Sequence, residues 1–238
     1  DVFVEAMLQA NECKKLKRQV LALIQVPAWV YAPREDLKER LSEKKVYDTP
    51  LFDPIVTHWL HDSSNDPILK RLHECGFRNE MEDKVKIVFV PCYLDGNDGI
   101  FDKPYYDMLI GDDLAVYPSY YEPWGYTPLE AVAFHVPCVT TSLSGFGMWA
   151  NQVKGAPSKL QDGVEVIERN DYNTHEVIDA MVQTLLSFAS SDKKQVDAMR
   201  RRAGKLSEKA LWKHFISYYY EAYDIALHKM QERNTKNS

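Results

Sequence analysis

The sequence lacks the features that mark membrane proteins and nucleic-acid-binding proteins. No run of apolar residues reaches the roughly 18 that a membrane-spanning helix needs, and no segment reads as a signal peptide. The formal net charge is −6, so there is no excess of positive charge for nucleic acid or an anionic membrane. We therefore expect neither nucleic acid nor a membrane among the partners.

Cysteine is also scarce. The four cysteines lie far apart and form no C-x-x-C pair, which fits neither a zinc site nor a disulfide framework. His58 and His61 stand three residues apart on an expected helix, but no carboxylate completes a familiar metal motif. We expect no metal and no cofactor. Scattered free thiols are typical of a reducing compartment and predict a cytoplasmic protein.

A linker rich in proline, glycine or serine is missing, as are repeats and low-complexity segments. The chain has 238 residues, 45% of them apolar and 27% charged, which suffices for a real core. We predict one domain over residues 1–207. Residues 208–238 would form a helix that packs on this domain or crosses from it, ending in a disordered tail over 231–238. The first residues, "DVFVEAM", carry no initiator methionine and read as helix, so we expect a fragment of a longer protein.

What the sequence does contain is a series of short apolar runs separated by helical patterns. These runs are Val20–Val26, Lys84–Val90, Leu114–Pro118, Pro137–Thr141 and Val164–Glu168. Short buried strands that alternate with helices predict an α/β fold with a doubly wound parallel sheet, Rossmann-like, and extra C-terminal helices. In such folds ligands bind at the carboxyl ends of the strands.

Two Asp-Pro pairs predict helix starts, because proline is favoured in the first turn of a helix. The first pair is Asp53-Pro54. The second is Asp66-Pro67, and its helix would end at Gly76.

The segment "YYEPWGYTPLEA", residues 120–131, directly follows a predicted strand. Thr127 and Glu130, with a proline after the threonine, match a capping box in which Thr127 is the N-cap. The start of this helix would offer free amides and a positive dipole end to an anion. Capping does not explain Glu122, which precedes the turn, and Gly125 permits a close approach of the backbone to a ligand.

The strings "PSYYEPWGYTPLEA" and "VPCVTTSLSGFG" resemble glycogen synthase of the fungal and animal type. The resemblance covers most of the chain and is closest from about Tyr105 to Gly147. Members of this family are retaining glycosyltransferases with two Rossmann-like halves, the GT-B arrangement. Glu122 and Glu130 match the family's E-x7-E pair, which implies that this chain is the C-terminal, donor-binding half.

The resemblance implies a role for each acid. Glu122 would lie against the donor glucose, hold its hydroxyls and stabilise an oxocarbenium-like transition state. Glu130 would bind the ribose of the nucleotide, although closing the capping box remains an alternative. The helix start at Thr127 would receive the diphosphate.

Other donor-binding residues follow from the same comparison. The backbone around Trp124, Gly125 and Tyr126 would contact the sugar. Tyr105 matches an aromatic residue that stacks on uracil, although an aromatic residue there could equally belong to the core.

Ser144 and Gly145, in "SLSGFG", resemble a loop that lines the cleft between the two halves. They could equally form a plain turn. Three contiguous arginines, Arg200 to Arg202, lie where eukaryotic relatives sense glucose 6-phosphate. Because contiguous residues point to different sides of a helix, a solvated basic face is the favoured interpretation.

The implied reaction transfers glucose from UDP-glucose to the 4-hydroxyl of a glucan chain end, with retention and without a metal. The partners would be UDP-glucose, the glucan acceptor and the missing N-terminal lobe, and a homo-oligomer remains open. In the family an Arg and a Lys that clamp the diphosphate precede the segment "DVFVEAM". We therefore expect the fragment to bind uridine nucleotides weakly and to transfer no glucose by itself.

The sequence also departs from the family at "FVPCYL", where a His and an acidic residue are expected. Two other readings stay open. One is a different retaining two-lobed glycosyltransferase, such as a sucrose or trehalose synthase relative. The other is a non-catalytic module that binds a nucleotide sugar or a glucan. The strings "EPWGYTP" and "TTSLSGFG" argue against the first of these, whereas an Arg and a Lys just upstream would favour the enzyme over the second.

Overall fold

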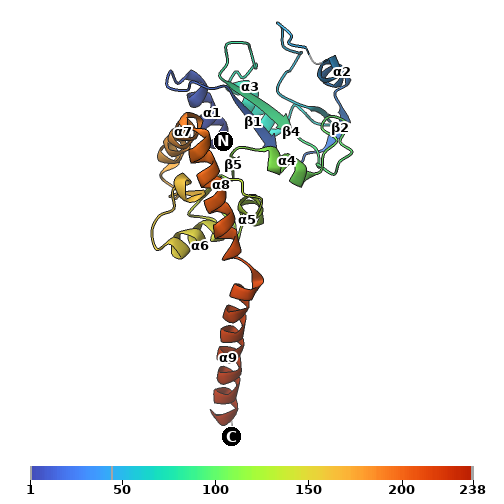
Figure 1. The fold of residues 1–238 in the computed structure, drawn as a ribbon. Coiled ribbons are helices and arrows are strands. Elements are labelled where there is room, and N and C mark those ends of the chain that lie inside the picture. The colour runs from blue at the N-terminus through green and yellow to red at the C-terminus, as the bar shows by residue number, and fades with distance from the viewer. Residues whose placement is uncertain (1, 44, 237–238) are drawn as a thin grey trace.

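The computed structural model describes residues 2–43 and 45–236, and it has an α/β fold with parallel strands and covering helices (Figure 1). Strand β1 (Val20–Gln25) pairs in parallel with β4 (Val85–Val90) along all six residues. Helix α1 (Val2–Glu12) covers this ladder with a buried apolar face. The pattern of apolar residues therefore produces the first parallel unit as expected.

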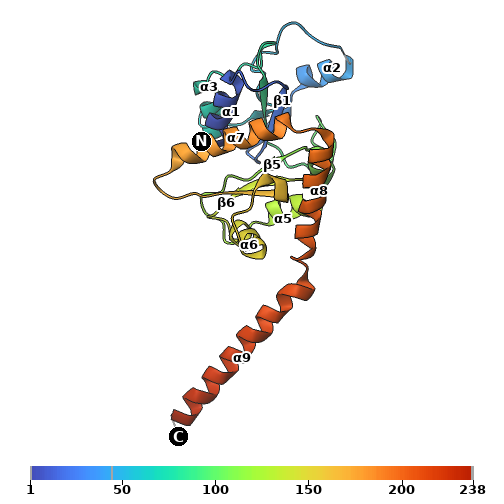
Figure 2. The same ribbon diagram turned by 60° about the vertical axis from the view of Figure 1, so that its left-hand side comes forward.

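A second parallel ladder has the strand order β5-β6-β7. Its members are β5 (Ala115–Val116), β6 (Cys138–Thr141) and β7 (Val164–Ile167). Every residue of β6 and β7 is buried, and Val139 and Ile167 belong to the same apolar cluster as β1 and β4. Helix α7 (Thr174–Ser190) packs on α1 and also contacts β7, so it joins the two ladders (Figure 2).

All five predicted strands are present, and the predicted α/β class with extra C-terminal helices is confirmed. The parallel strands form two hydrogen-bonded ladders rather than one continuous sheet. The strands were predictable because continuous apolar runs are typical of strands buried on both faces.

An antiparallel pair was not predicted. It joins β2 (Val30–Pro33) to β3 (His58–Leu60), and α2 (Glu35–Glu43) follows β2. The predicted helix start at Asp53-Pro54 is wrong. Asp53 takes a left-handed φ of 48°, and the buried guanidinium of Arg34 donates hydrogen bonds to the carbonyls of Phe52, at 2.6 Å, and of Asp53. This contact across the sequence fixes the chain as a loop.

The second Asp-Pro pair does begin a helix, α3 (Pro67–Glu74). The Asp66 carboxylate accepts a hydrogen bond from the Leu69 backbone N–H at 2.8 Å, which is an N-cap. Gly76 follows the helix with a φ of 72°, as expected for a C-terminal glycine.

Six helical elements remain in the described part of the chain. They are α4 (Tyr105–Gly111), α5 (Tyr126–Ala133), α6 (Gly145–Lys154), the 3-10 turn η1 (Leu160–Asp162), α8 (Lys193–Glu208) and α9 (Trp212–Lys236). Helix α8 packs on α5 and η1, whereas α9 extends away from the body of the molecule (Figures 1 and 2). The predicted tail is wrong for residues 231–236, which are helical, and residues 237–238 lie outside the described part of the chain.

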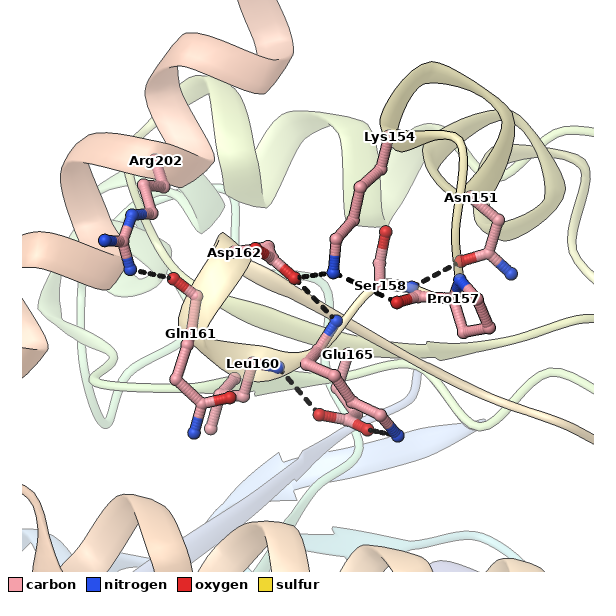
Figure 3. Close-up of polar contacts among 10 residues, drawn as sticks. Asn151, Lys154, Pro157, Ser158, Leu160, Gln161, Asp162, Glu165 and Arg202 are labelled. Atoms are coloured by element: carbon pink, nitrogen blue, oxygen red, sulfur yellow. Dashed lines mark hydrogen bonds and ion pairs between the residues drawn. The ribbon is translucent and has the colours of Figure 1, made fainter.

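Polar contacts fasten η1 to its neighbours (Figure 3). Lys154 pairs with Asp162 and also donates to the Pro157 carbonyl at 3.0 Å. Arg202 donates to the Gln161 carbonyl at 2.5 Å. Arg200 similarly donates to a carbonyl, that of Asp112, at 2.7 Å. Arg200 is partly buried and binds a main-chain oxygen, so it departs from the predicted solvated basic face, whereas Arg201 and Arg202 are exposed as predicted.

Candidate functional site

The carboxyl ends of β5, β6 and β7 meet at one edge of the ladder, because parallel strands end on the same side. Side chains tie these ends together. The Thr141 hydroxyl donates to the Ser119 carbonyl at 2.6 Å, and Arg169 donates to the Pro118 carbonyl at 2.6 Å. The edge expected to bind a ligand is thus a connected structure rather than three separate loops.

Glu122 lies at this edge and is half-buried. Its carboxylate accepts a hydrogen bond from the Ser119 hydroxyl at 2.8 Å. Its backbone N–H donates to the Leu143 carbonyl at 3.1 Å, and its carbonyl accepts from the Gly145 N–H at 3.1 Å. Glu122 is therefore held on both sides of its main chain, which fixes where the carboxylate stands.

Ser144 and Gly145 are the residues that hold the Glu122 loop. Ser144 is fully buried, and its hydroxyl donates to the Trp124 carbonyl at 3.1 Å while capping α6 through the Gly147 N–H at 3.3 Å. A Cβ atom on Gly145 would lie 2.2 Å from the Pro123 carbonyl oxygen, so only glycine fits this approach. They form the start of α6 rather than an open loop, and direct contact of either residue with a ligand stays a prediction.

The predicted capping box at the start of α5 is wrong. The helix begins at Tyr126 with Gly125 as the N-cap, and Gly125 has a φ of 107°. Because the left-handed glycine starts the helix early, Thr127 lies inside the first turn and no side chain caps the helix. Glu130 instead accepts a hydrogen bond from the Tyr106 hydroxyl at 3.0 Å. The amides of the first turn thus remain available to an anion.

The ring of Trp124 faces the interior. It packs against Phe146, Trp149 and Phe215, with ring centroids 6.2, 5.9 and 5.6 Å away. The predicted contact of the Trp124 backbone with a sugar stays a prediction. Tyr126, by contrast, is 72% exposed.

Tyr105 begins α4 beside a hollow of about 320 Å³. The hollow lies at the carboxyl ends of β1 and β4 and is lined by Gln25, Pro27, Cys92, Tyr93, Leu94, Asp95 and Tyr105. Burial raises the pKa of the Tyr105 hydroxyl, so the ring stays neutral at physiological pH. Neither Glu122 nor Glu130 lines this hollow, but the neighbouring Tyr106, 5.3 Å from Tyr105 between centroids, connects it to Glu130.

Two residues at the site escaped the sequence analysis. Arg169 follows β7 and stacks its guanidinium over the Tyr120 ring at 5.1 Å. Tyr106 bonds Glu130 from another helix. The position of Arg169, directly after a predicted strand, was the available signal. Nothing local marks Tyr106, because its partner lies 24 residues away.

One group of potential metal ligands occurs among the described residues: His58, Cys92 and Asp98, with ligand atoms within 4.8 Å of one another. His58 lies in β3 rather than on a helix, so the expected helical pair with His61 is wrong. The ring nitrogens of His58 already meet the Thr57 hydroxyl at 2.9 Å and the Asp98 carbonyl at 2.8 Å. Burial raises the pKa of the Cys92 thiol to about 11, so the thiol is protonated near neutral pH.

The Asp98 carboxylate is equally occupied, because it accepts hydrogen bonds from the backbone N–H groups of Ile100, Phe101 and Asp102. The group fastens the loop after β4, and its hydrogen bonds are satisfied without an ion. In the described part of the chain, no helix is long and apolar enough to cross a membrane.

A parallel α/β fold with a connected edge at the carboxyl ends of its strands defines a class of proteins that bind ligands at that edge. A family model for glycogen synthase matches residues 36–237. The chain belongs to the glycogen synthase family.

Three relatives illustrate the match. Over 95% of this chain, the sequence is 32% identical to glycogen [starch] synthase isoform 1 of Saccharomyces cerevisiae. Over 82% of this chain, it is 32% identical to the liver glycogen [starch] synthase of Mus musculus. Over 81% of this chain, it is 33% identical to glycogen [starch] synthase of Neurospora crassa. These alignments cover 29%, 27% and 27% of the three relatives, so the chain spans less than a third of their length.

Among solved structures, that of WaaG, a glycosyltransferase involved in lipopolysaccharide biosynthesis, aligns with 86% of this chain and 46% of its own. The TM-score is 0.42 and the sequence identity is 16%, and at these values the likeness supports no conclusion.

Proposed function

We propose that this chain is the donor-binding part of a glycogen synthase. The whole enzyme transfers glucose from UDP-glucose to the 4-hydroxyl of a glucan chain end, with retention at the anomeric carbon. One observation carries the proposal. The Glu122 carboxylate and the uncapped start of α5 stand at the same strand edge, and the start of α6 holds the loop between them.

Each residue then has a chemical task. The first-turn amides of α5, at Tyr126 and Thr127, bind the diphosphate, since a helix start favours negative charge. The Glu122 carboxylate stabilises the positive charge that develops at the anomeric carbon. Because Ser119 and the α6 loop fix this carboxylate beforehand, little reorganisation is needed as the charge develops.

The nucleoside occupies the hollow beside Tyr105, with the base on the tyrosine ring and the ribose near Glu130. The Tyr106 hydroxyl orients the Glu130 carboxylate from α4. The acceptor-binding lobe and the cations that clamp the diphosphate belong to the rest of the whole protein, which works in the cytoplasm and needs no metal. The chain by itself therefore binds uridine nucleotides weakly and transfers no glucose.

Calorimetric titration of the full-length protein with UDP and with ADP tests the donor site. UDP should bind more tightly, and Tyr105→Ala should weaken UDP binding by about 1–3 kcal/mol, the usual value of base stacking on an aromatic ring. Tyr47→Ala, at a surface tyrosine near α2, is the matched control and should leave UDP affinity unchanged. Equal affinities of Tyr105→Ala and the unsubstituted protein would exclude the proposed stacking.

A further inference from the structure

Three aromatic rings lie together on one face of the β2–β3 pair. The Trp29 and His61 rings are stacked, with centroids 4.3 Å apart, and Tyr31 meets His61 edge-on at 5.6 Å. The three rings are called the aromatic platform below.

The backbone holds this platform rigidly. The His61 N–H donates to the Trp29 carbonyl at 3.0 Å, which continues the antiparallel pairing of Val30 with Leu60. The Ala28 N–H donates to the Pro91 carbonyl at 2.8 Å and anchors the segment to the chain that leaves β4. These bonds fix the main chain that carries the rings, and the stacking of Trp29 on His61 keeps these two rings together, which lowers the entropic cost of binding.

The platform is exposed although its rings are large. Trp29 is 74% exposed and Tyr31 is 69% exposed. Within the described residues, no side-chain hydrogen bond involves the Trp29 indole, the Tyr31 hydroxyl or the His61 ring nitrogens. Single exposed apolar residues are common, but a rigid group of adjacent rings marks a binding surface.

The chemistry of the platform fits a neutral sugar polymer. Residues 26–33, "VPAWVYAP", carry no charged side chain, so ring faces and neutral polar groups dominate the platform apart from the ionisable His61 ring. A glucose unit has a flat face of C–H groups and a rim of hydroxyls. The face can cover an indole ring, and the rim can reach the Tyr31 hydroxyl and the His61 nitrogens.

The position of the platform also fits a glucan. Gln25 and Pro27, directly before Trp29 in the chain, line the hollow that contains Tyr105. A long polymer held on the platform would thus be kept beside the donor site. Such tethering raises the local concentration of chain ends without a contact at the reacting carbon.

We infer that Trp29, Tyr31 and His61 form a glucan-binding site separate from the donor site, with a glucose unit stacked on Trp29. This inference rests on the proposed function, because that function supplies the glucan.

The test is calorimetric titration of the full-length protein with maltoheptaose, a short linear glucan, and separately with UDP. Trp29→Ala should weaken maltoheptaose binding about tenfold, the loss expected for one stacked aromatic ring. Trp29→Phe keeps a planar ring and should stay within about twofold of the unsubstituted protein. Phe52→Ala removes another exposed ring, 86% accessible, and should change nothing.

UDP affinity should be the same in all of these proteins, because the platform does not contact the nucleotide. Unchanged maltoheptaose affinity in Trp29→Ala, or an equal loss in Phe52→Ala, would overturn the inference. A parallel loss of UDP binding in Trp29→Ala would overturn it too, since the substitution would then act through the fold. If the unsubstituted protein binds maltoheptaose but not UDP, the result contradicts the proposed donor site and leaves the proposed glucan-binding site standing.

Discussion

At the scale of single residues, Gly145 determines whether the Glu122 loop can close on α6. Its Cα touches the chain at Pro123 so closely that a methyl group would stand 2.2 Å from the carbonyl oxygen. Backbone lies on both sides of this contact, so neither partner can rotate away as a side chain would. The position of the proposed catalytic carboxylate thus depends on a residue that has no side chain.

Gly145→Ala should lower the free energy of unfolding by about 1–3 kcal/mol, the usual cost of forcing an extra methyl group into a packed contact. Urea denaturation of the full-length protein measures the change. Gly111→Ala is the matched control, because nothing lies within 4 Å of its new Cβ atom. The control should be neutral or stabilising by up to about 1 kcal/mol, as alanine favours helix. If the two variants lose equal stability, the contact with Pro123 is not the cause.

Asp112, at the C-terminal end of α4, carries a charge in an unfavourable place. Burial, together with the neighbouring Asp113, raises its pKa to about 6, and Arg200 offsets this only in part. In the unfolded chain the pKa of Asp112 is near 3.8. Between pH 3.8 and about 6, the folded state therefore binds more protons than the unfolded state. Stability should therefore fall as the pH rises from about 4 to 6 and stay low above that range.

Asp112→Asn removes this charge and keeps the backbone carbonyl that Arg200 binds. After allowance for solvent screening, the variant should gain about 1 kcal/mol at pH 8 and much less at pH 4. Urea denaturation at both pH values measures the difference. A gain of the same size at pH 4 and pH 8 would show that the charge is not responsible.

The candidate site residues come from the motif and their roles stay predictions, but the hydrogen bonds that these residues make could not be predicted. Glu122 and Glu130 follow from the spacing in "EPWGYTPLE". The bond that Glu130 makes depends on Tyr106 in another helix, and the start of α5 depends on the left-handed φ of Gly125. A capping pattern is local, whereas these two facts are set by tertiary structure.

At the scale of elements, α8 approaches α5 through Gly204. A Cβ atom there would stand 2.5 Å from Nε2 of His135, a residue with a φ of 62° directly after α5. This contact sets how closely α8 approaches α5, the helix whose start is the proposed diphosphate site.

A double-mutant cycle tests this contact. Gly204→Ala should cost about 1–2 kcal/mol of stability in the unsubstituted protein, because the His135 ring must move. The same substitution in a His135→Ala background should cost less, which gives a coupling energy of about 0.5 kcal/mol or more. Thermal or urea unfolding supplies the four values. Additive effects would show that the ring does not limit the approach of α8.

The same scale separates the elements that could be predicted from those that could not. The five parallel strands are continuous apolar runs, and such a run indicates a buried strand from the local sequence alone. The pair β2–β3 is short, and β2 ends in proline, so no local pattern marks it. Asp53-Pro54 and Asp66-Pro67 look alike in sequence. They differ because Arg34 binds the carbonyls around the first pair, and a buried arginine 18 residues away leaves no local trace.

At the scale of the whole molecule, the chain is less than a third of the length of its relatives. Helix α9 touches the body mainly where Phe215 meets Trp124 and Trp149, and beyond that contact it extends away (Figure 1). Its exposed aromatic residues include Tyr218, Tyr219, Tyr220 and Tyr223. We propose that in the whole protein α9 packs against a second lobe, so that the two lobes close over the donor.

The most direct measurement is the transfer of labelled glucose from UDP-glucose to glycogen by the full-length protein, compared with its Glu122→Gln variant. The unsubstituted protein should place label at the glucan chain ends. In the variant, the rate should fall by about 10²–10³, the usual loss when one preorganised stabilising group is removed. UDP affinity should stay the same, because Glu122 does not bind the nucleotide. Transfer at an unchanged rate by Glu122→Gln would contradict the proposed role of this carboxylate, and no transfer by the unsubstituted protein would contradict the proposed function.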